Sequence, residues 1–382
     1  MMRKVIYIDI DTYPREGFTS GLFITVREIL KRLSLYKFDP HLVSFSGSKD
    51  ENIKKIIKKK DGLTIIEFFF PKTIFYNDPL QMKYNIRNIL KVEFSLDDIF
   101  ILSTPAIFLN PVLLEVLKTL KDRKSNAKII AFDELFPDKK GGVNMRQLNK
   151  YFKLLKHFEI YAVSSKIKKK LSALISKKVR YFPNIFNLKK IQVDKKYSVR
   201  EYVVMINTHP IKGVDIFNEI AKRMTNVKFM IVESWVDVPK YTAVSKNIKH
   251  KRFTKNIKDI YKKTKILFVP SLCQEGPARV IIEAAINGIP VLANKIGSIP
   301  ENGKIVQLVQ PPKICGYFNK DSVLFPIVDK VELMKCAESY VEKIFEILDN
   351  KNFNHFSKVT KNLAMKKICN SNGLFDKIVR KW

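Results

Sequence analysis

Two glutamates, Glu275 and Glu283, lie on either side of a predicted junction between a loop and a helix. The apolar run from Ile266 to Val269 before them is typical of a buried strand. Gly276-Pro277 predicts the start of a helix, because proline at the first helical position lacks only an N–H that has no partner there. Asn287-Gly288 predicts its end. Glu275 is therefore expected in the loop, and Glu283 about two turns inside the helix.

The N-terminus of this predicted helix would present free N–H groups and a partial positive charge, which together suit a phosphate group. Two carboxylates beside an anion site suggest a ligand that carries both phosphates and hydroxyls, such as a nucleotide-sugar. Simpler interpretations stay open. Arg279 and Glu283 are four residues apart and could form a surface ion pair, and Glu275 could be a solvated loop carboxylate.

A lysine on the preceding strand-to-helix connection is the second candidate. The predicted strand Tyr202–Ile206 ends at Asn207, and Lys212-Gly213 follows just before a helix. A lysine in such a loop can hold its ammonium group over phosphates that enter the same crevice. The alternative is an incidental solvated lysine in a lysine-rich chain.

The string from Phe268 to Val291, taken with Lys212-Gly213, resembles the signature of the retaining family 4 glycosyltransferases, also called glycosyltransferase group 1. The resemblance implies the GT-B fold. It also implies that Glu275 holds hydroxyls of the donor sugar, that Glu283 holds the ribose, and that Lys212 neutralises the donor diphosphate. It is specific from about Asn207 to Glu301 and diffuse over the N-terminal half.

The chain departs from the family pattern before the lysine, where many members carry a phosphate-binding arginine. Here the residues are Asn207-Thr208-His209. Either Arg279 or Arg252 replaces the arginine, or the amide of Asn207 and the hydroxyl of Thr208 do. His209 could also be a ligand, although a single loop histidine is more often incidental. The donor-binding residues expected from the resemblance are Gly276, Pro277, Ala278, Arg279, Glu283, Asn207, Thr208, Gly17 and Gly21.

The N-terminal half offers weaker candidates. A loop with Gly17 and Gly21 follows the first predicted strand and would let the backbone approach a ligand, with Thr19 or Ser20 capping the next helix. Its spacing is not that of a dinucleotide-binding fingerprint. By resemblance, Asp133 and Glu134 at a later strand end are candidates for an acidic residue near the reacting sugar carbon.

A metal site is the alternative at Asp9 and Asp11, which lie one residue apart at a strand end. The pair suggests either a metal-dependent glycosyltransferase or a haloacid-dehalogenase-type phosphatase. The motif of metal-dependent glycosyltransferases normally lies well inside a chain rather than on its first strand. The phosphatase motif needs a second acidic pair at the end of a later strand, whereas Asp97-Asp98 lies before a predicted strand. No cofactor and no required metal are therefore expected.

Apolar strands alternate with amphipathic helices along the whole chain, which predicts parallel sheets covered on both faces. Two such sheets imply two doubly wound, Rossmann-like domains with ligand bound at the C-terminal ends of the strands, in a cleft between the domains. Pro183-Asn184 and the polar stretch after it predict the boundary. The expected domains are 1–187, an acceptor-side domain; 188–353, a donor domain; and 354–382, a helix and tail that could pack on the first domain.

The expected strands are Val5–Ile10, His41–Ser44, Leu63–Phe69, Ile99–Leu102, Lys128–Phe132, Ile160–Val163, Arg180–Phe182, Tyr202–Ile206, Lys228–Val232, Ile248–Lys249, Ile266–Pro270, Ile289–Ala293 and Ile305–Leu308. Helices are expected between them, among others at Thr19–Leu35, Pro111–Lys121, Asn144–Phe158, Val214–Met224 and Ile257–Thr264. A last helix is expected over about Asn354–Lys367.

The net charge of +33 is the one unusual bulk property. It predicts attraction to polyanions, although a lysine-rich composition can also arise without function. Residues 53–60 are predicted to form a short basic helix, and Lys166 to Arg180 a second one. Both could contact an anionic membrane surface or could simply be solvated, while a nucleic-acid partner is not favoured. No apolar run has the ~20 residues of a membrane span.

The four cysteines lie in the C-terminal half without metal-site spacing, which fits a reducing, cytoplasmic setting. The whole pattern predicts a metal-independent retaining glycosyltransferase that moves a hexose-type sugar from a nucleotide-diphosphate sugar to a glycan or lipid-linked acceptor. Another GT-B enzyme, an epimerase or a phosphorylase, is one alternative. A basic polyanion-binding module is the other.

Overall fold

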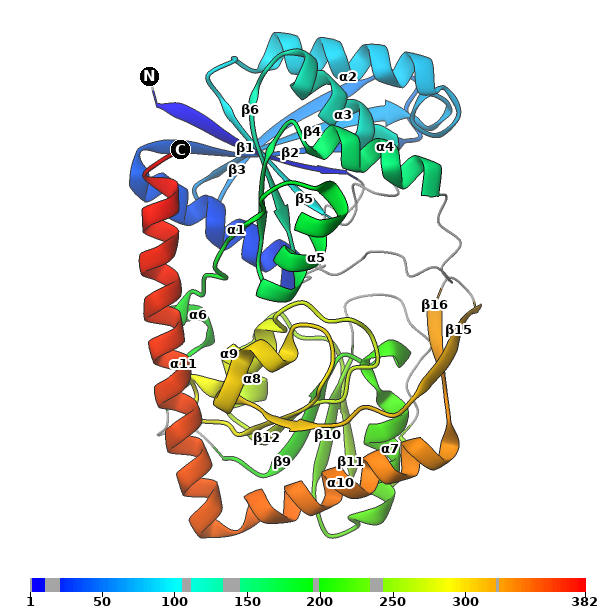
Figure 1. Cartoon of the computed structure of the whole chain (residues 1–382), viewed down its shortest axis with the longest axis vertical. Coiled ribbons are helices and arrows are strands. Elements are labelled where there is room, and N and C mark those ends of the chain that lie inside the picture. Colours follow the sequence, from blue (N-terminus) through cyan, green and yellow to red (C-terminus); the bar gives the residue numbers. More distant parts are fainter. Residues whose placement is uncertain are drawn as a thin grey trace. The chain divides into compact units, whose positions relative to one another are not determined.

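The computed structural model describes residues 2–10, 21–104, 111–132, 145–194, 199–233, 243–320 and 323–382. They form two compact units (Figure 1). The first contains the described residues up to Ile185 together with Ser371–Trp382, and the second spans Phe186–Asn370. Each unit is built around its own sheet.

The first unit contains an eight-stranded sheet with the order β3-β4-β2-β1-β5-β6-β7-β8. All neighbouring pairs are parallel except β3 with β4. The order runs outward in both directions from β1, as the prediction of a doubly wound sheet requires. The strands are β1 (Arg3–Ile10), β2 (Phe38–Ser48), β3 (Lys54–Lys60), β4 (Leu63–Pro71), β5 (Ile99–Thr104), β6 (Asn126–Ala131), β7 (Glu159–Ala162) and β8 (Arg180–Tyr181).

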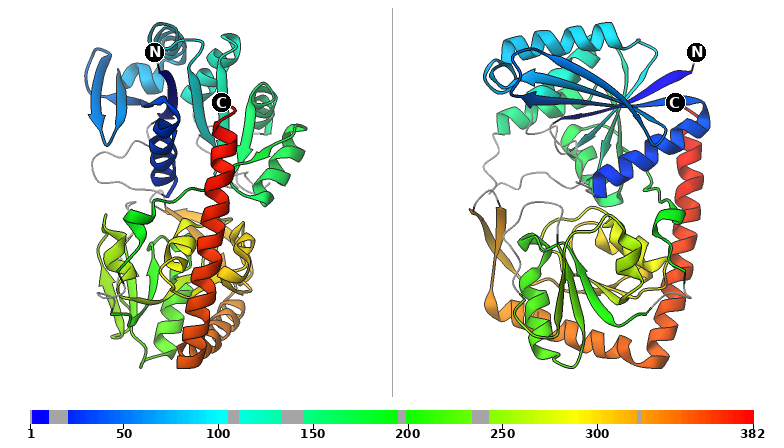
Figure 2. Two further views of the ribbon diagram at one scale, coloured as in Figure 1. Left: turned by 90° about the vertical axis from the view of Figure 1, so that its left-hand side faces the viewer. Right: turned by 180° about the vertical axis from the view of Figure 1, so that it is seen from behind.

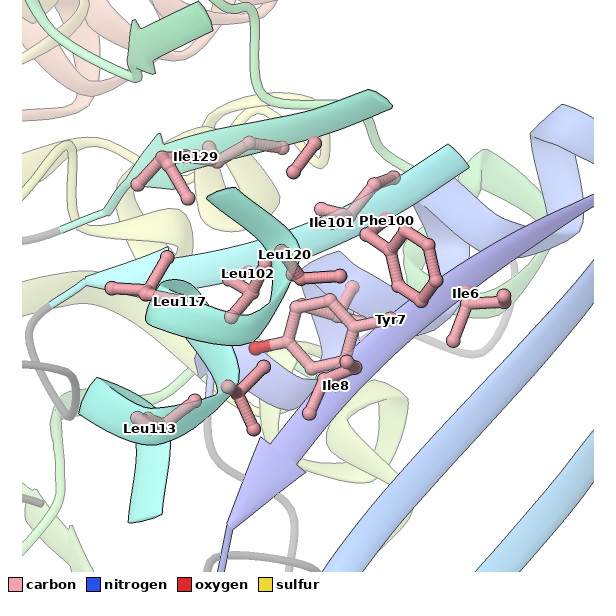
Figure 3. Close-up of a cluster of buried hydrophobic side chains, with 14 of the residues drawn as sticks. Ile6, Tyr7, Ile8, Phe100, Ile101, Leu102, Leu113, Leu117, Leu120 and Ile129 are labelled. Carbon is pink, nitrogen blue, oxygen red and sulfur yellow. The ribbon is translucent and has the colours of Figure 1, made fainter. Parts of the chain in front are cut away.

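Helices cover both faces of this sheet (Figure 2). The close-up in Figure 3 shows one face, where Tyr7 of β1 and Leu102 of β5 pack against Leu117 of α3. Central strands buried on both faces explain the continuous apolar runs of the sequence. The helices of this unit are α1 (Gly21–Leu33), α2 (Pro79–Glu93), α3 (Pro111–Asp122), α4 (Met145–Leu155) and α5 (Ser165–Ile175), with the shorter η1 (Ser34–Tyr36) and η2 (Thr73–Asn77).

The predicted basic helix at residues 53–60 is wrong. Lys54–Lys60 form β3, an edge strand paired antiparallel with β4. The connection is the two-residue turn Asp61-Gly62, in which both residues have positive φ. Such a turn matches the twist of a β-hairpin. The second basic segment is helical over the first part of its predicted range, because α5 runs from Ser165 to Ile175 and begins at the Ser164 cap, whereas Arg180 begins β8.

The second unit contains a six-stranded parallel sheet with the order β11-β10-β9-β12-β13-β14. In chain order this is 3-2-1-4-5-6, the arrangement of dinucleotide-binding domains. The order reverses between β9 and β12, which are direct neighbours. The strands are β9 (Tyr202–Ile206), β10 (Phe229–Val232), β11 (Ile248–Lys251), β12 (Thr264–Val269), β13 (Val291–Asn294) and β14 (Gln307–Val309). The thirteen predicted strands of both sheets are confirmed, with ends that differ by a few residues.

The two faces of this sheet have separate cores. Val203 and Met205 of β9 pack with α7 and α10 on one face, whereas Val204 packs with Ile260 of α8 on the other, because side chains alternate along a strand. The helices are α6 (Leu188–Ile191), α7 (Val214–Arg223), α8 (Ile257–Tyr261), α9 (Arg279–Ala285) and α10 (Lys330–Leu348), with η5 (Pro210–Lys212) and η6 (Ile299–Ile305).

Two features of this unit differ from expectation. The helix predicted to start at Gly276-Pro277 starts at Arg279, because Ala278 has a left-handed conformation (φ 33°) that cannot belong to the helix. A hairpin of β15 (Ile314–Lys320) and β16 (Val323–Val328) was not predicted. Its short strands carry apolar residues without a clear alternation, and most of them stay partly exposed.

The C-terminal helix is longer than predicted. α11 (Asn350–Val379) has 30 residues, and its last part belongs to the first unit. There Phe375 and Trp382 pack with Phe182, and the indole of Trp382 stacks on the Phe182 ring at 6.0 Å. The indole N–H also donates to the Tyr161 hydroxyl at 3.2 Å. The tail is therefore part of the core of the first unit.

Candidate functional site: the strand ends at the switch point of the second sheet

Two loops follow the neighbouring strands β9 and β12. Residues 207–213 follow β9 and residues 270–278 follow β12. Since the two strands are parallel and adjacent, both loops leave the same edge of the sheet, at the point where the strand order reverses. Ligands of doubly wound domains bind at this place.

Lys212 and Glu275, which lie 63 residues apart in the sequence, are in direct contact. The Nζ atom of Lys212 is 2.5 Å from Oε1 of Glu275. The Ser271 hydroxyl donates to the same oxygen at 2.6 Å. In the part of the chain that the structure describes, both hydrogen bonds to this carboxylate reach Oε1, so Oε2 can accept from a ligand.

Backbone contacts hold the two loops together. The N–H of Leu272 donates to the carbonyl of Ile211 at 2.8 Å. A Cβ on Gly213 would lie 2.0 Å from the Pro270 carbonyl oxygen, and Gly213 has a φ of 87°. Only glycine allows this close approach. The Lys212-Gly213 step therefore brings the ammonium group to the carboxylate.

The backbone of Glu275 is fixed from a third loop. The Ser298 N–H donates to the Glu275 carbonyl at 2.8 Å. The neighbouring Gly297 has a φ of 56°, and a Cβ there would lie 2.3 Å from the same carbonyl oxygen. This loop was not predicted from the sequence, although its Gly-Ser step lies within the segment of specific resemblance.

Gly297→Ala is expected to lower the free energy of unfolding by at least about 2 kcal/mol, because it adds a steric clash to a left-handed conformation. Gly62→Ala is the matched control, since Gly62 has a φ of 76° and no atom within 4 Å of its Cβ position. Urea unfolding of both variants measures the difference. Equal losses would contradict the close packing of residue 297 against Glu275.

Glu283 lies in a buried polar cluster. Its side chain is 8% exposed, and its Oε1 accepts from Nε of Arg279 at 3.2 Å. Its Oε2 accepts from the hydroxyl of Tyr261 at 3.0 Å. Burial and the nearby carboxylate of Glu283 raise the pKa of Tyr261 well above 10, so the phenol stays a donor. The proposed ion pair of Arg279 and Glu283 exists, but it is buried rather than on the surface.

Aromatic and amide groups complete this cluster. The guanidinium of Arg279 lies 4.4 Å from the centre of the Phe186 ring, a cation–π arrangement. Asn287 at the end of α9 donates to the carbonyls of Glu283 and Ile191, at 2.8 and 3.0 Å. The predicted end of this helix is confirmed, because Gly288 has a φ of 64°.

The structure constrains the predicted replacements for the missing arginine. Arg279 is occupied by Glu283 and Phe186. Arg252 follows β11, which is separated from β9 by β10. Asn207 has a φ of 91°, and its Oδ1 accepts from the His209 N–H at 2.8 Å, while Thr208 is buried.

His209 caps η5. Its Nδ1 accepts from the Ile211 N–H at 3.3 Å. Burial, and then the charge of Lys212, lowers the pKa of His209 below its usual 6.5. The neutral ring therefore provides the acceptor on which the loop before Lys212 depends.

Protonation of His209 is expected to destabilise the second unit. Because its pKa is lower in the folded state, the unfolded chain takes up the proton first, and stability falls as the pH drops below about 6.5. The loss is expected to stay below about 1 kcal/mol, since the ring is only half-buried. His209→Asn keeps an acceptor and should lose less stability between pH 7 and pH 5.5 in urea titrations. An equal loss in both proteins would contradict this.

Several predicted residues lie outside the described part of the chain. These are Gly17, Thr19, Ser20, Asp133, Glu134 and Asp11. Gly21 is the first residue of α1, and Asp9 is described only in its backbone. Among the described residues, there is no group of three or more His, Cys, Asp or Glu side chains that could hold a metal ion. The described helices include none that is long and apolar enough to cross a membrane.

Comparisons with known proteins agree with this geometry. Residues 201–317 match the model of the family described as glycosyl transferases group 1. This segment contains both loops, α9 and the Gly297-Ser298 step. The predicted resemblance to group 1 glycosyltransferases is thereby confirmed for the second unit. A search of curated protein sequences finds no match.

Solved structures share the fold of the whole chain. Sucrose-phosphate synthase from Thermosynechococcus elongatus has a TM-score of 0.70 at 12% identity, over 99% of this chain and 97% of that one. A glycosyltransferase from Rickettsia africae has a TM-score of 0.68 at 14% sequence identity, over 99% of this chain and 98% of that one. HepE of Anabaena, solved in complex with UDP and glucose, has a TM-score of 0.67 at 12% sequence identity, over 100% of both chains. The chain thus has the GT-B fold, and residues 201–317 of its second unit match the model of glycosyl transferases group 1.

Proposed function

We propose that the protein is a metal-independent, retaining glycosyltransferase that uses a nucleotide-diphosphate sugar as donor. The contact between Lys212 and Glu275 carries this proposal. It places a cation and a carboxylate together at the switch point of a nucleotide-binding type of sheet, inside the segment that matches glycosyl transferases group 1.

The pair of Lys212 and Glu275 has a direct use in donor binding. A diphosphate carries more negative charge than one carboxylate, so it attracts the ammonium group of Lys212 more strongly. Release from Lys212 leaves Glu275 held by Ser271 and able to accept from sugar hydroxyls through both oxygens. The backbone N–H groups of Gly276, Ala278 and Arg279 add donors for the diphosphate.

Glu283 is proposed to hold the ribose. A carboxylate has about four acceptor positions, and Arg279 and Tyr261 use two of them. Ribose hydroxyls would take the others, and the two existing bonds would fix the orientation of the carboxylate. Its low exposure fits a contact that excludes water from the nucleoside.

The proposed reaction breaks the bond between the anomeric carbon and the diphosphate and forms a bond from that carbon to the acceptor oxygen. Attack on the front face retains the configuration, and the departing phosphate oxygen takes the acceptor's proton. Charge that develops on the diphosphate is stabilised by Lys212, which is already in position before the reaction. Asp133 and Glu134 remain proposed contacts near the reacting carbon.

We infer a hexose-type sugar and a glycan or lipid-linked acceptor from the family resemblance, together with a place in polysaccharide or glycoconjugate synthesis in the cytoplasm. One of the similar structures supports a nucleotide-sugar donor, since HepE was solved with UDP and glucose. An epimerase or phosphorylase would share the donor site. A purely polyanion-binding module would not need the site at all.

Thermal unfolding with a panel of nucleotide-sugars tests the proposal. A donor at 100 times its Kd stabilises the folded state by about 2.7 kcal/mol and raises the melting temperature. At least one UDP-, GDP- or ADP-linked hexose is expected to do so, whereas free hexoses are not. No shift with any nucleotide-sugar would refute the proposal. Conversion of a stabilising donor to its epimer would identify an epimerase, and turnover that depends on phosphate would identify a phosphorylase.

A further inference from the structure

The edge strand β3 of the first unit is exposed along its whole length. Its sequence is Lys-Lys-Ile-Ile-Lys-Lys-Lys, and all seven residues are exposed. Ile57 is 58% exposed, Ile56 is 38% exposed, and Ile53 just before the strand is 42% exposed. Three isoleucines among five lysines at a sheet edge are unusual, because edge strands commonly carry charges rather than exposed aliphatic side chains.

The lysines of β3 divide into a paired and an unpaired group. Lys54, Lys55 and Lys58 form ion pairs with Asp50, Glu93 and Glu67, at 2.9, 2.5 and 2.9 Å. Lys59 and Lys60 have no acidic partner within 4.0 Å in the described part of the chain. The C-terminal half of the strand therefore keeps a net positive charge, in a chain whose total charge is +33.

A second copy of the chain does not suit this edge. Pairing of β3 with another β3 would place lysines opposite or diagonal to lysines, and like charges across strands are destabilising. Lysine on an exposed edge is a common means of preventing such pairing. The partner is therefore expected to be negatively charged.

The isoleucines identify the kind of anion. Recognition of single-stranded nucleic acid relies on aromatic side chains that stack on bases, and β3 has none. Aliphatic side chains beside lysines suit the boundary between lipid headgroups and acyl chains, where the lysine stems lie along the apolar layer and the ammonium groups reach the phosphates. The outer backbone groups of an edge strand need polar partners, which headgroups and water supply at that depth.

The other basic segment lacks this combination. On α5 the apolar residues Ile167, Leu171 and Ile175 are buried in the core of the first unit, so the helix presents mainly lysines to solvent. It lacks the exposed isoleucines that accompany the lysines of β3. It therefore serves as an internal control.

We propose that Ile53–Lys60, the basic edge of the first unit, binds the surface of an anionic phospholipid bilayer. Ile53 and Ile57, which the alternation of side chains along a strand places on one face, enter the headgroup boundary, and Lys59 and Lys60 contact lipid phosphates. Membrane binding at this edge needs neither donor nor acceptor, so it can be tested, and can fail, independently of the proposed transferase activity.

The charge contribution is tested by flotation of the full chain with vesicles of phosphatidylcholine containing one part in three of phosphatidylglycerol. Lys59→Gln/Lys60→Gln is expected to weaken binding about 25-fold, at about fivefold for each lysine near anionic lipid. The matched control Lys169→Gln/Lys178→Gln removes the same charge from exposed residues in and after α5. It should weaken binding less than threefold. Equal losses in the two variants, or no binding to these vesicles, would overturn the proposal.

The apolar contribution is tested with Ile57→Thr, which keeps a β-branched side chain suited to the strand. It is expected to weaken vesicle binding about threefold, whereas Leu174→Ala, at an exposed position on α5, leaves it unchanged. Melting curves check that all variants fold. An unchanged affinity of Ile57→Thr would overturn the insertion of the isoleucines. Tighter binding to an oligonucleotide than to vesicles, lost in Lys59→Gln/Lys60→Gln, would replace the membrane with nucleic acid.

Discussion

Lys212→Ala is expected to reduce the rate of sugar transfer by about 10²–10³-fold, the usual effect of removing one preorganised charge from the transition state. The lysine lies 2.5 Å from Glu275 at the ends of β9 and β12. In the proposed reaction it faces the diphosphate, whose negative charge grows as the sugar leaves. The loss should therefore appear in kcat as well as in KM, and steady-state kinetics with the stabilising donor measures both.

Two further variants make this result specific. Lys222→Ala removes an exposed lysine from α7 of the same unit and should leave kcat unchanged. Glu275→Gln retains an acceptor for Ser271 but removes the charge that pairs with Lys212. It should impair transfer while the protein still binds the nucleoside diphosphate. Full turnover in Lys212→Ala would contradict the assignment of this site.

Glu283→Ala is expected to lower the free energy of unfolding by about 3–5 kcal/mol, the usual cost of removing one partner of a buried ion pair. The side chains of Arg279 and Glu283 are 10% and 8% exposed. Loss of the carboxylate leaves the guanidinium buried without its counter-charge and the hydroxyl of Tyr261 without its acceptor. Urea unfolding at pH 7 measures the change.

The proposed ribose contact needs a separate measurement, because a purely structural role would also destabilise the protein. Tyr261→Phe removes one hydrogen bond to Glu283 and should cost only about 1 kcal/mol. Glu283→Gln is expected to weaken binding of a nucleoside diphosphate about tenfold and to leave binding of pyrophosphate unchanged. Equal changes for both ligands would show that Glu283 acts only through the fold.

The sequence was most informative where local signals and topology coincide. Glu275 follows a strand whose apolar run is continuous, and Lys212-Gly213 follows another one. Once both strands are placed in a doubly wound sheet, their C-terminal ends must share one edge, so the contact between the two residues follows from the strand order. Without a sheet order, their separation of 63 positions in the sequence carries no information on their distance in space.

The environment of Glu283 could not be predicted in the same way. Tyr261 lies at the end of α8, before β12, and Phe186 lies at the start of the second unit. Both reach the cluster around Glu283 only through tertiary packing, for which a single sequence offers no periodic signal. The spacing of Arg279 and Glu283 predicted their pairing correctly, but spacing alone does not determine burial.

The prediction for residues 53–60 failed because a short apolar run has no reliable periodicity. The spacing of its three isoleucines and five lysines fits a helix as well as it fits a strand. The informative signal was the turn after them, since Asp61-Gly62 is a strong predictor of a two-residue β-hairpin. The apolar strand β4 that follows this turn was predicted, and the turn pairs residues 54–60 with it as a neighbouring antiparallel strand.

Release of nucleoside diphosphate from the stabilising nucleotide-sugar tests the central claim most directly. With an acceptor glycan or lipid present, the wild-type protein and Lys222→Ala are expected to release the diphosphate at equal rates. Lys212→Ala is expected to release it about 10²–10³-fold more slowly. Release at the wild-type rate by Lys212→Ala, or no release by the wild-type protein from any nucleotide-sugar, would contradict a donor site formed by Lys212 and Glu275.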